Sequence, residues 1–168
     1  MGDGEVSLVR LAEHCRALDL RPTDVGEGAL LCVLPHAHGP RPLVLALDAE
    51  RQVVCFDLPA LLQAPPQRRG TVAAVGMHVN YSLLLGAFRL DLRDGELAFG
   101  LRVPYREAGF GRAQFEHCIS AIGWTLDQHL PSLLRACWGR EEAEEILGLP
   151  LPSPLDELLG GDAEGPGA

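Results

Sequence analysis

The side chains most able to do chemistry in this sequence are its cysteines and histidines, and three of them lie close together along the chain. Cys32, His36 and His38 offer a thiolate and two imidazoles, which are ligands that zinc prefers. Zinc also needs a fourth, tetrahedral ligand, and none lies near these three. A strand would point Cys32 inward, whereas the histidines fall in a loop with proline and glycine. We therefore expect unligated loop histidines, no bound metal and no other cofactor.

Two pairs of adjacent residues resemble a thiol nucleophile with its base, namely His14 with Cys15 and His117 with Cys118. Neighbouring residues on a helix point about 100° apart, so neither pair can form the hydrogen bond that activates a thiol. Both cysteines fall on apolar helical faces, which indicates core packing. Paired carboxylates for acid–base catalysis are not evident. We expect no catalytic site, although an enzyme whose site is assembled from distant residues is an alternative.

Composition and charge limit the partners of this chain. Its 168 residues carry a formal net charge of −9, and residues 140–168 hold one arginine and eight acidic residues. The basic footprint of a nucleic-acid-binding protein is absent, so we expect no nucleic-acid partner. No apolar run approaches the ~20 residues that cross a membrane. The lack of lysine is typical of a G+C-rich bacterial genome, and the five cysteines have no paired spacing, so we expect a cytoplasmic bacterial protein with reduced, buried thiols.

The segment from Asn80 to Val103 predicts a β-hairpin with one apolar face. Asp94-Gly95 is a favoured pair for a two-residue type I′ turn. Folding about that turn gives the cross-strand pairs Leu92 with Leu97, Leu90 with Phe99, Phe88 with Leu101 and Gly86 with Val103. These residues alternate with charged and small ones, so one face of the sheet should be apolar and the other wet.

Helical and strand-like patterns fill the rest of the chain up to residue 138. The expected helices cover residues 5–19, 71–81 and 111–138, and the expected strands cover residues 29–34, 43–48, 53–58 and the two arms of the hairpin. Residues 60–63 could add one helical turn before Pro65-Pro66. The predicted fold is α+β in the order α-βββ-α-ββ-α, a five-stranded twisted antiparallel sheet with helices packed on one face.

The length fits a single domain, which we expect to cover residues 1–147. Residues 148–168 are rich in proline, glycine and acidic residues, which predicts a disordered tail. The Pro-rich segment Leu149-Pro-Leu-Pro-Ser-Pro-Leu155 could bind a groove on another protein, although such tails are more often solvated ends.

The element order and the segment from His78 to Asp91 resemble the YbjN-like family. The positions that match the family's pattern are Asn80, Gly86, Phe88, Asp94-Gly95 and His129-Leu130-Pro131. The resemblance covers about residues 5–138 and implies the fold of type III secretion chaperones, a twisted antiparallel sheet with helices on it. Members of that family have been described as regulators or as peptide-binding chaperones, and the resemblance implies no catalytic residues.

These features predict a non-enzymatic, chaperone-like or regulatory module that binds another protein or a peptide segment. We expect the partner to dock on the sheet edge or in an apolar groove between sheet and helices. The residues expected to contact it are Asn80, Tyr81, Phe88, Arg89 and Arg102. For Asn80, capping of a helix before a strand is the structural alternative. A homodimer or a self-associating structural protein is the alternative for the whole chain.

Overall fold

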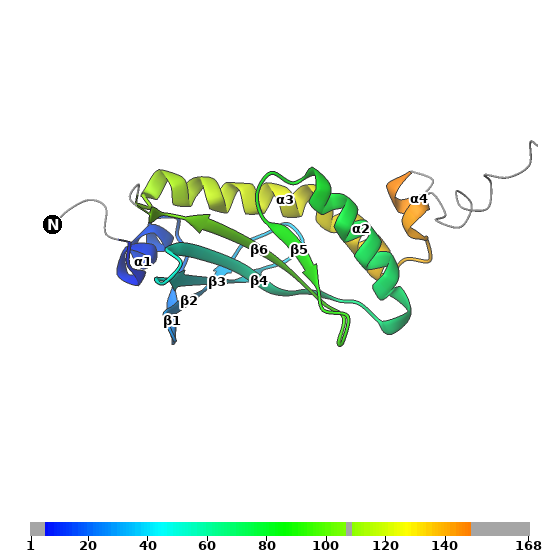
Figure 1. The fold of residues 1–168 in the computed structure, drawn as a ribbon, viewed down its shortest axis with the longest axis horizontal. Helices are drawn as coiled ribbons and strands as arrows, with labels where there is room; N and C mark the ends of the chain where they lie inside the picture. The colour runs from blue at the N-terminus through cyan, green and yellow to red at the C-terminus, as the bar shows by residue number, and fades with distance from the viewer. Residues whose placement is uncertain (1–5, 107–108, 149–168) are drawn as a thin grey trace, which may run out of the picture.

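The computed structural model of this protein describes residues 6–106 and 109–148. The predicted acidic tail lies outside these ranges, apart from Gly148. The described elements, in chain order, are α1 (Leu8–Ala17), β1 (Thr23–Gly26), β2 (Ala29–Leu34), β3 (Arg41–Asp48), β4 (Val53–Gln63), the 3₁₀ helix η1 (Pro66–Arg68), α2 (Arg69–Ser82), β5 (Ala87–Leu90), β6 (Glu96–Pro104), α3 (Arg112–Trp138) and α4 (Ala143–Leu147) (Figure 1).

Within the described ranges, six strands form one antiparallel sheet in the spatial order β1-β2-β3-β4-β6-β5. The predicted α+β class is confirmed, but the prediction of five strands is wrong. The additional strand is β1, which pairs with β2 across a tight turn at Glu27-Gly28. All four residues of β1 are exposed, so this strand lacks the alternation of apolar and polar residues by which a strand is recognised in a sequence.

Strand β4 continues to Gln63, through the residues 60–63 that were expected to form a helical turn. A bulge explains this error, because the pairing register with β6 shifts between Leu58 and Leu62 and Ala60 adopts a φ of 49°. The bulge buries the adjacent residues Leu61 and Leu62 together. Two neighbouring buried residues break the two-residue alternation of a strand, so the sequence pattern at this point does not identify a strand.

The β5–β6 hairpin has the predicted faces but a register that differs by two residues. Leu90 pairs with Leu97, and Phe88 pairs with Phe99. The predicted type I′ turn is wrong: Gly95 has a φ of 90°, whereas Asp94 is outside the left-handed region that this turn requires of both residues. Since side chains alternate with a period of two, a two-residue shift leaves the paired strand residues on their predicted faces. The prediction for Leu92 is wrong, because Leu92 lies beyond the end of β5 and is 63% exposed.

The hydrophobic core lies between the sheet and the helices. Helix α3 runs along the sheet, α1 lies near its β2 and β3 strands, and α2 packs beside β5 (Figure 1). Side chains at alternate positions of β4 and β6 are almost fully buried, among them Phe56 and Phe99. Phe56 also contacts Phe110 and Phe115, with ring centroids 6.2 and 5.7 Å away. The apolar face predicted for the hairpin therefore forms part of this core.

Arg68 holds α4 against the ends of α2 and α3. Its side chain is only 12% exposed. Its Nε donates to the carbonyl oxygen of Ala136 at 2.9 Å, one Nη pairs with the carboxylate of Glu142 at 3.1 Å, and the other donates to the carbonyl oxygen of Glu141. The hydroxyl of Thr71 donates to the same Glu142 carboxylate at 3.1 Å. A single guanidinium therefore connects three helices.

We expect Arg68→Met to lower the free energy of unfolding by about 1–3 kcal/mol, because two part-buried carbonyl oxygens lose their donor. Amide hydrogen exchange should accelerate mainly in α4. Urea unfolding and exchange mass spectrometry measure both effects. Arg51→Met is the control: Arg51 is 77% exposed in its pair with Asp48, so its loss should leave the midpoint of urea unfolding nearly unchanged. Equal losses in the two variants would contradict this role for Arg68.

Candidate functional site

The cysteine and histidines that suggested a metal site do not converge. Cys32 is buried, and its Sγ lies 3.6 Å from the Sγ of Cys15. The His36 side chain is 4% exposed, and its Nε2 lies 2.9 Å from a carboxylate oxygen of Asp127 on α3. His38 is exposed; its backbone N–H donates to Nδ1 of His36 at 3.2 Å, and the two rings lie 5.4 Å apart. In residues 6–106 and 109–148, no group of three or more His, Cys, Asp or Glu side chains could hold a metal ion.

The thiols are in environments that oppose nucleophilic chemistry. All five cysteines lie in the described ranges as free thiols, and four of them are buried. Burial raises the pKa of Cys118 to about 11, which disfavours the reactive thiolate. Burial also lowers the pKa of His14, whose ring packs 5.6 Å from that of Phe115. Cys15 and Cys118 therefore belong to the core, as their positions on apolar helical faces predicted, and His14 packs half-buried beside it.

Asn80 bonds to a strand instead of capping a helix. It lies inside α2, which continues to Ser82, so the capping interpretation is wrong. Its Nδ2 donates to the carbonyl oxygen of Phe88 at 2.9 Å, and the N–H of Phe88 donates to its Oδ1 at 2.7 Å. Phe88 is 5% exposed and packs edge-on against Phe99, with centroids 5.0 Å apart. These two predicted contact residues are therefore tied into the fold.

The Asn80 amide also restricts docking at the edges of the sheet. It satisfies the outward-facing N–H and C=O of Phe88, so it stands where a neighbouring strand would otherwise pair with β5. The opposite edge is β1, a four-residue strand whose pairing with β2 shifts at a bulge. Short or bulged edges are poor templates for an added strand. The geometry therefore favours a groove over a sheet edge as the docking surface.

Arg89 and Arg102, also predicted to contact a partner, meet on the outer face of the sheet. Both pair with one carboxylate oxygen of Asp57 on β4, Arg102 at 2.9 Å. The guanidinium of Arg89 lies over Gly100, where an added Cβ would approach its Nη2 to 2.8 Å. Both arginines are exposed, so these ion pairs contribute little stability. The predicted contact residues thus lie in separate parts of the molecule.

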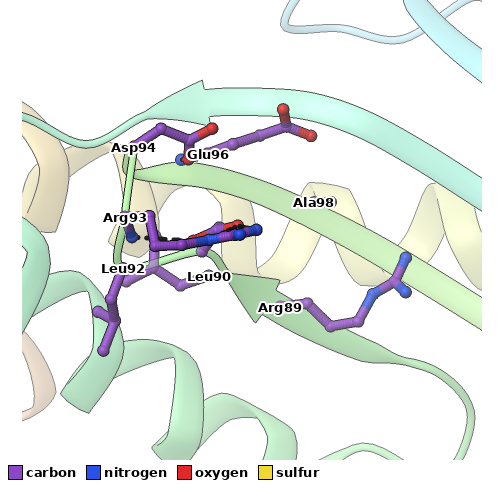
Figure 2. A pocket seen from close by; sticks show the side chains of 8 residues that line it. Arg89, Leu90, Leu92, Arg93, Asp94, Glu96 and Ala98 are labelled. Atoms are coloured by element: carbon purple, nitrogen blue, oxygen red, sulfur yellow. Dashed lines mark hydrogen bonds and ion pairs between the residues drawn. The ribbon is translucent and has the colours of Figure 1, made fainter.

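A hollow of about 640 Å³ opens beside Arg89 on the outer face of the hairpin (Figure 2). Its charged side chains pair mostly with their own neighbours. Arg93 binds Asp91 at 2.6 Å and lowers the pKa of that carboxyl to about 2, and Glu96 accepts from the N–H of Ala60 at 3.2 Å. Figure 2 shows Arg89 directed away from Arg93. This hollow therefore has the character of a solvated charged surface.

A different surface exposes large apolar side chains, and we call it the Trp124 patch. Its members are Leu84 and Leu85 in the loop after α2, and Trp124 on α3. Their exposed fractions are 99%, 43% and 60%, respectively. Tyr81, near the end of α2, is 93% exposed. Such a cluster on neighbouring elements is unusual in a protein without partners.

The loop between α2 and β5 is held in place at both ends. Leu83 ends α2, and its side chain packs against the core. Gly86 then turns the chain into β5 with a φ of 77°, in a position where a Cβ would lie 2.3 Å from the ring of Phe99. With these anchors fixed, Leu84 and Leu85 are left at the surface. The exposure of Leu84 and Leu85 therefore follows from the fixed positions of Leu83 and Gly86 on either side of them.

The loop and α3 enclose a groove of about 370 Å³ next to the Trp124 patch. The groove is lined by Ser82, Leu83, Leu84, Leu85, His117, Ala121, Trp124, Thr125 and His129. None of these nine residues is acidic. The ring of His129 lies edge-on to that of Trp124, 6.2 Å away, and burial lowers the pKa of His129, which favours the uncharged imidazole. A mostly apolar groove with few polar groups suits an apolar ligand segment.

Comparison with known proteins identifies the family. The family model YbjN, described as "Putative bacterial sensory transduction regulator", matches residues 7–135. This chain belongs to the YbjN family. The resemblance inferred from Asn80, Gly86 and the hairpin is thereby confirmed. A search among curated proteins finds no match.

A solved structure of a YbjN protein shares the fold of this chain. It is titled "Crystal structure of YbjN, a putative transcription regulator from E. coli"; it is 16% identical, has a TM-score of 0.56, and the match covers 74% of this chain and 94% of that one. A second, "Structure of the HopA1-SchA Chaperone-Effector Complex", is 18% identical with a TM-score of 0.40, and covers 81% and 91%. Over residues 6–106 and 109–148, no helix has both the length and the apolar character needed to span a bilayer.

Two positions of the YbjN pattern, Asn80 and Gly86, thus have roles in the fold next to the Trp124 patch. None of the residues Leu84, Leu85 and Trp124 was predicted as a contact from the sequence. A signal was present in α3, because Trp124 lies off the apolar stripe that contains Phe115, Ile122 and Leu126. A tryptophan on the polar face of an amphipathic helix points to a binding surface. Of the five predicted contact residues, Tyr81 precedes Ser82 of the groove lining in the sequence.

Proposed function

We propose that this member of the YbjN family is a non-enzymatic module that binds another polypeptide in the groove between residues 82–85 and α3. The observation that carries the proposal is the exposure of Leu84 and Trp124 beside an apolar groove. Removing such side chains from water contributes roughly 25 cal/mol per Å² of buried apolar area. Tryptophan is also enriched among the residues that dominate binding energy at protein interfaces.

The charge and the family description support a protein partner. A net charge of −9 opposes binding to the phosphate backbone of nucleic acids. The family's description as a sensory transduction regulator fits a protein that acts by binding others. Tyr81 would extend the contact beyond the groove. Arg89 and Arg102 lie on the outer face of the sheet and would require a second contact surface.

In-cell photocrosslinking tests this proposal. A photoreactive phenylalanine analogue placed at Leu84 should give a discrete adduct with another protein in cells that express the chain naturally. The same analogue at Val9, an apolar residue on α1 that is 68% exposed, is the matched control and should give none. Adding Trp124→Ser to the Leu84 probe should reduce the adduct at least about tenfold, the loss expected for a dominant aromatic contact.

The alternatives give different adducts. Equal adducts at Leu84 and Val9, or none at Leu84, would overturn the proposed groove. An adduct only between two copies of this chain would favour the self-associating alternative instead. Circular dichroism should show that Trp124→Ser keeps its secondary structure, because the replaced side chain is 60% exposed.

A further inference from the structure

The chain that follows α4 contains an apolar segment that could fill the groove of the Trp124 patch. Residues 149–159 include five leucines and three prolines. Within them, Leu155, Leu158 and Leu159 have the i, i+3, i+4 spacing that aligns side chains on one face of a helix. Segments that stay solvated have low hydrophobicity, so this density of leucine requires another explanation.

The same segment contains the signals that begin and end a short helix. Ser153 is a favoured N-cap residue, and Pro154 follows at the first helical position. Asp156 and Glu157 fall in the first turn, where negative charge is stabilised. Gly160 follows the last leucine, as is typical of a helix end. The sequence therefore favours an amphipathic helical turn at residues 154–159, with leucines on one side and carboxylates on the other.

The segment can reach the groove from its point of departure. Gly148 ends α4, which contacts both α2 and α3. Trp124 lies fourteen residues before Trp138, the last residue of α3, roughly 21 Å along the helix at 1.5 Å per residue. The seven residues from Gly148 to Leu155 span up to roughly 23–25 Å when extended. His129, at the nearer end of the groove, lies nine residues before Trp138, roughly 14 Å along the helix, so the segment has length left for the path from Gly148 to α3.

The charges of groove and segment are compatible. The groove lining has no carboxylate, and its titratable side chains are His117 and His129. Residues 149–168 carry four acidic residues and no basic ones. With the leucines directed into the groove, Asp156 and Glu157 would face water without meeting a negative group of the lining. A segment tethered this closely has an effective concentration in the millimolar range, which favours it over a free peptide of similar affinity.

We propose that residues 154–159 of this chain bind in the groove between residues 82–85 and α3, where they cover Trp124 and compete with the partner polypeptide. The competition rests on the proposed function, whereas the intramolecular contact does not. A partner can bind only those molecules in which the segment has left the groove. The apparent affinity for the partner is therefore the intrinsic affinity multiplied by the fraction of molecules with an empty groove. The Pro-rich segment noted in the sequence would then be the connection that brings this inhibitory segment to its site.

Tryptophan fluorescence tests the contact in the full chain. Trp124 and Trp138 are the two tryptophans, so Trp138→Phe leaves Trp124 as the single emitter. In this background, ending the chain after Gly148 should shift the emission of Trp124 to longer wavelength. It should also raise its acrylamide quenching constant about twofold, because the indole changes from covered to 60% exposed. A synthetic peptide of residues 149–163 should reverse both changes.

Point variants separate the leucine face from the rest of the segment. Leu158→Ser with Leu159→Ser, in the full chain, should reproduce the truncated spectrum. The matched control, Leu149→Ser with Leu151→Ser, should keep the shielding. Equal quenching constants for the full and truncated chains would overturn the proposal. Shielding that disappears on dilution would also overturn it, because it would show that the segment of a second copy covers Trp124.

Crosslinking then separates this inference from the proposed function. If truncation raises the adduct yield at Leu84, the segment and the partner compete for the groove. If the adduct forms equally with and without the segment, the partner site stands and the inhibitory contact is refuted. If fluorescence shows shielding but no partner adduct forms in either chain, the contact stands and the proposed function fails.

Discussion

Gly95→Ala should lower the free energy of unfolding by about 3–5 kcal/mol, because it combines backbone strain with a steric clash. Gly95 has a φ of 90°, a conformation that alanine adopts only at a cost. A Cβ at this position would lie 2.1 Å from the carbonyl oxygen of Ala64 and 2.9 Å from Nε of Arg69. Ala64 follows β4 and Arg69 begins α2, so the clash is with a part of the chain that is distant in sequence.

The hairpin loop cannot relieve this clash by moving away. The N–H of Ala64 donates to the carbonyl oxygen of Gly95 at 2.8 Å. The guanidinium of Arg69 donates to the carbonyl oxygens of Leu92, Arg93 and Asp94 at 2.9, 3.2 and 2.7 Å. A displaced loop would lose these bonds as well, so relaxation replaces one cost with another.

Urea denaturation of Gly95→Ala and Gly39→Ala measures the two contributions separately. Gly39 also has a positive φ, 94°, but a Cβ added there would meet no atom within 4 Å, so its alanine variant should lose only about 1–2 kcal/mol through strain. A similar loss in both variants would show that the contact with Ala64 and Arg69 has no energetic consequence.

Asn80→Leu should lower the free energy of unfolding by about 2–4 kcal/mol, because it preserves the shape of the side chain and removes both of its hydrogen bonds. The N–H and the carbonyl oxygen of Phe88 would then lack partners next to the core. Hydrogen exchange of the Phe88 amide should accelerate along with the loss of stability. The variant also opens the edge of β5 and should associate more readily at high concentration.

Asn80→Asp is the matched control for this prediction. The aspartate keeps an oxygen that accepts from the N–H of Phe88, but it has no donor for the carbonyl oxygen. Its stability should fall between those of the natural protein and Asn80→Leu. An Asn80→Leu variant as stable as the natural protein would contradict the role assigned to this amide.

The fold was predictable where a pattern within one segment determines the structure. The apolar stripe of α3 and the alternation along β6 identified both elements and their buried faces. The hairpin register was not predictable in the same way, because it depends on Ala64 and Arg69, which come from another part of the chain. Strand β1 was missed because its residues are all exposed, and pairing with β2 alone defines it.

The candidate site was harder to predict because exposure is a property of packing. Phe88 and Leu84 are both apolar residues of one short segment, yet they are 5% and 99% exposed. The sequence indicated that Asn80 matters, but its bonding partner lies eight residues further along, beyond a turn. The hollows, the groove and the separation of Arg89 and Arg102 from Tyr81 could be located only after the elements were assembled.

Because of where the cysteines lie, alkylation of their thiols can report which parts of the fold have unfolded. Cys55 is the half-buried member of the five, on the outer face of β4, whereas Cys15, Cys32, Cys118 and Cys137 are buried between helices and sheet. Desolvation raises the pKa of Cys55 and Cys137 as well, which slows alkylation of the closed state. Because the buried thiols sit on α1, β2 and α3, the order in which they acquire an alkyl group would report which part of the chain separates first.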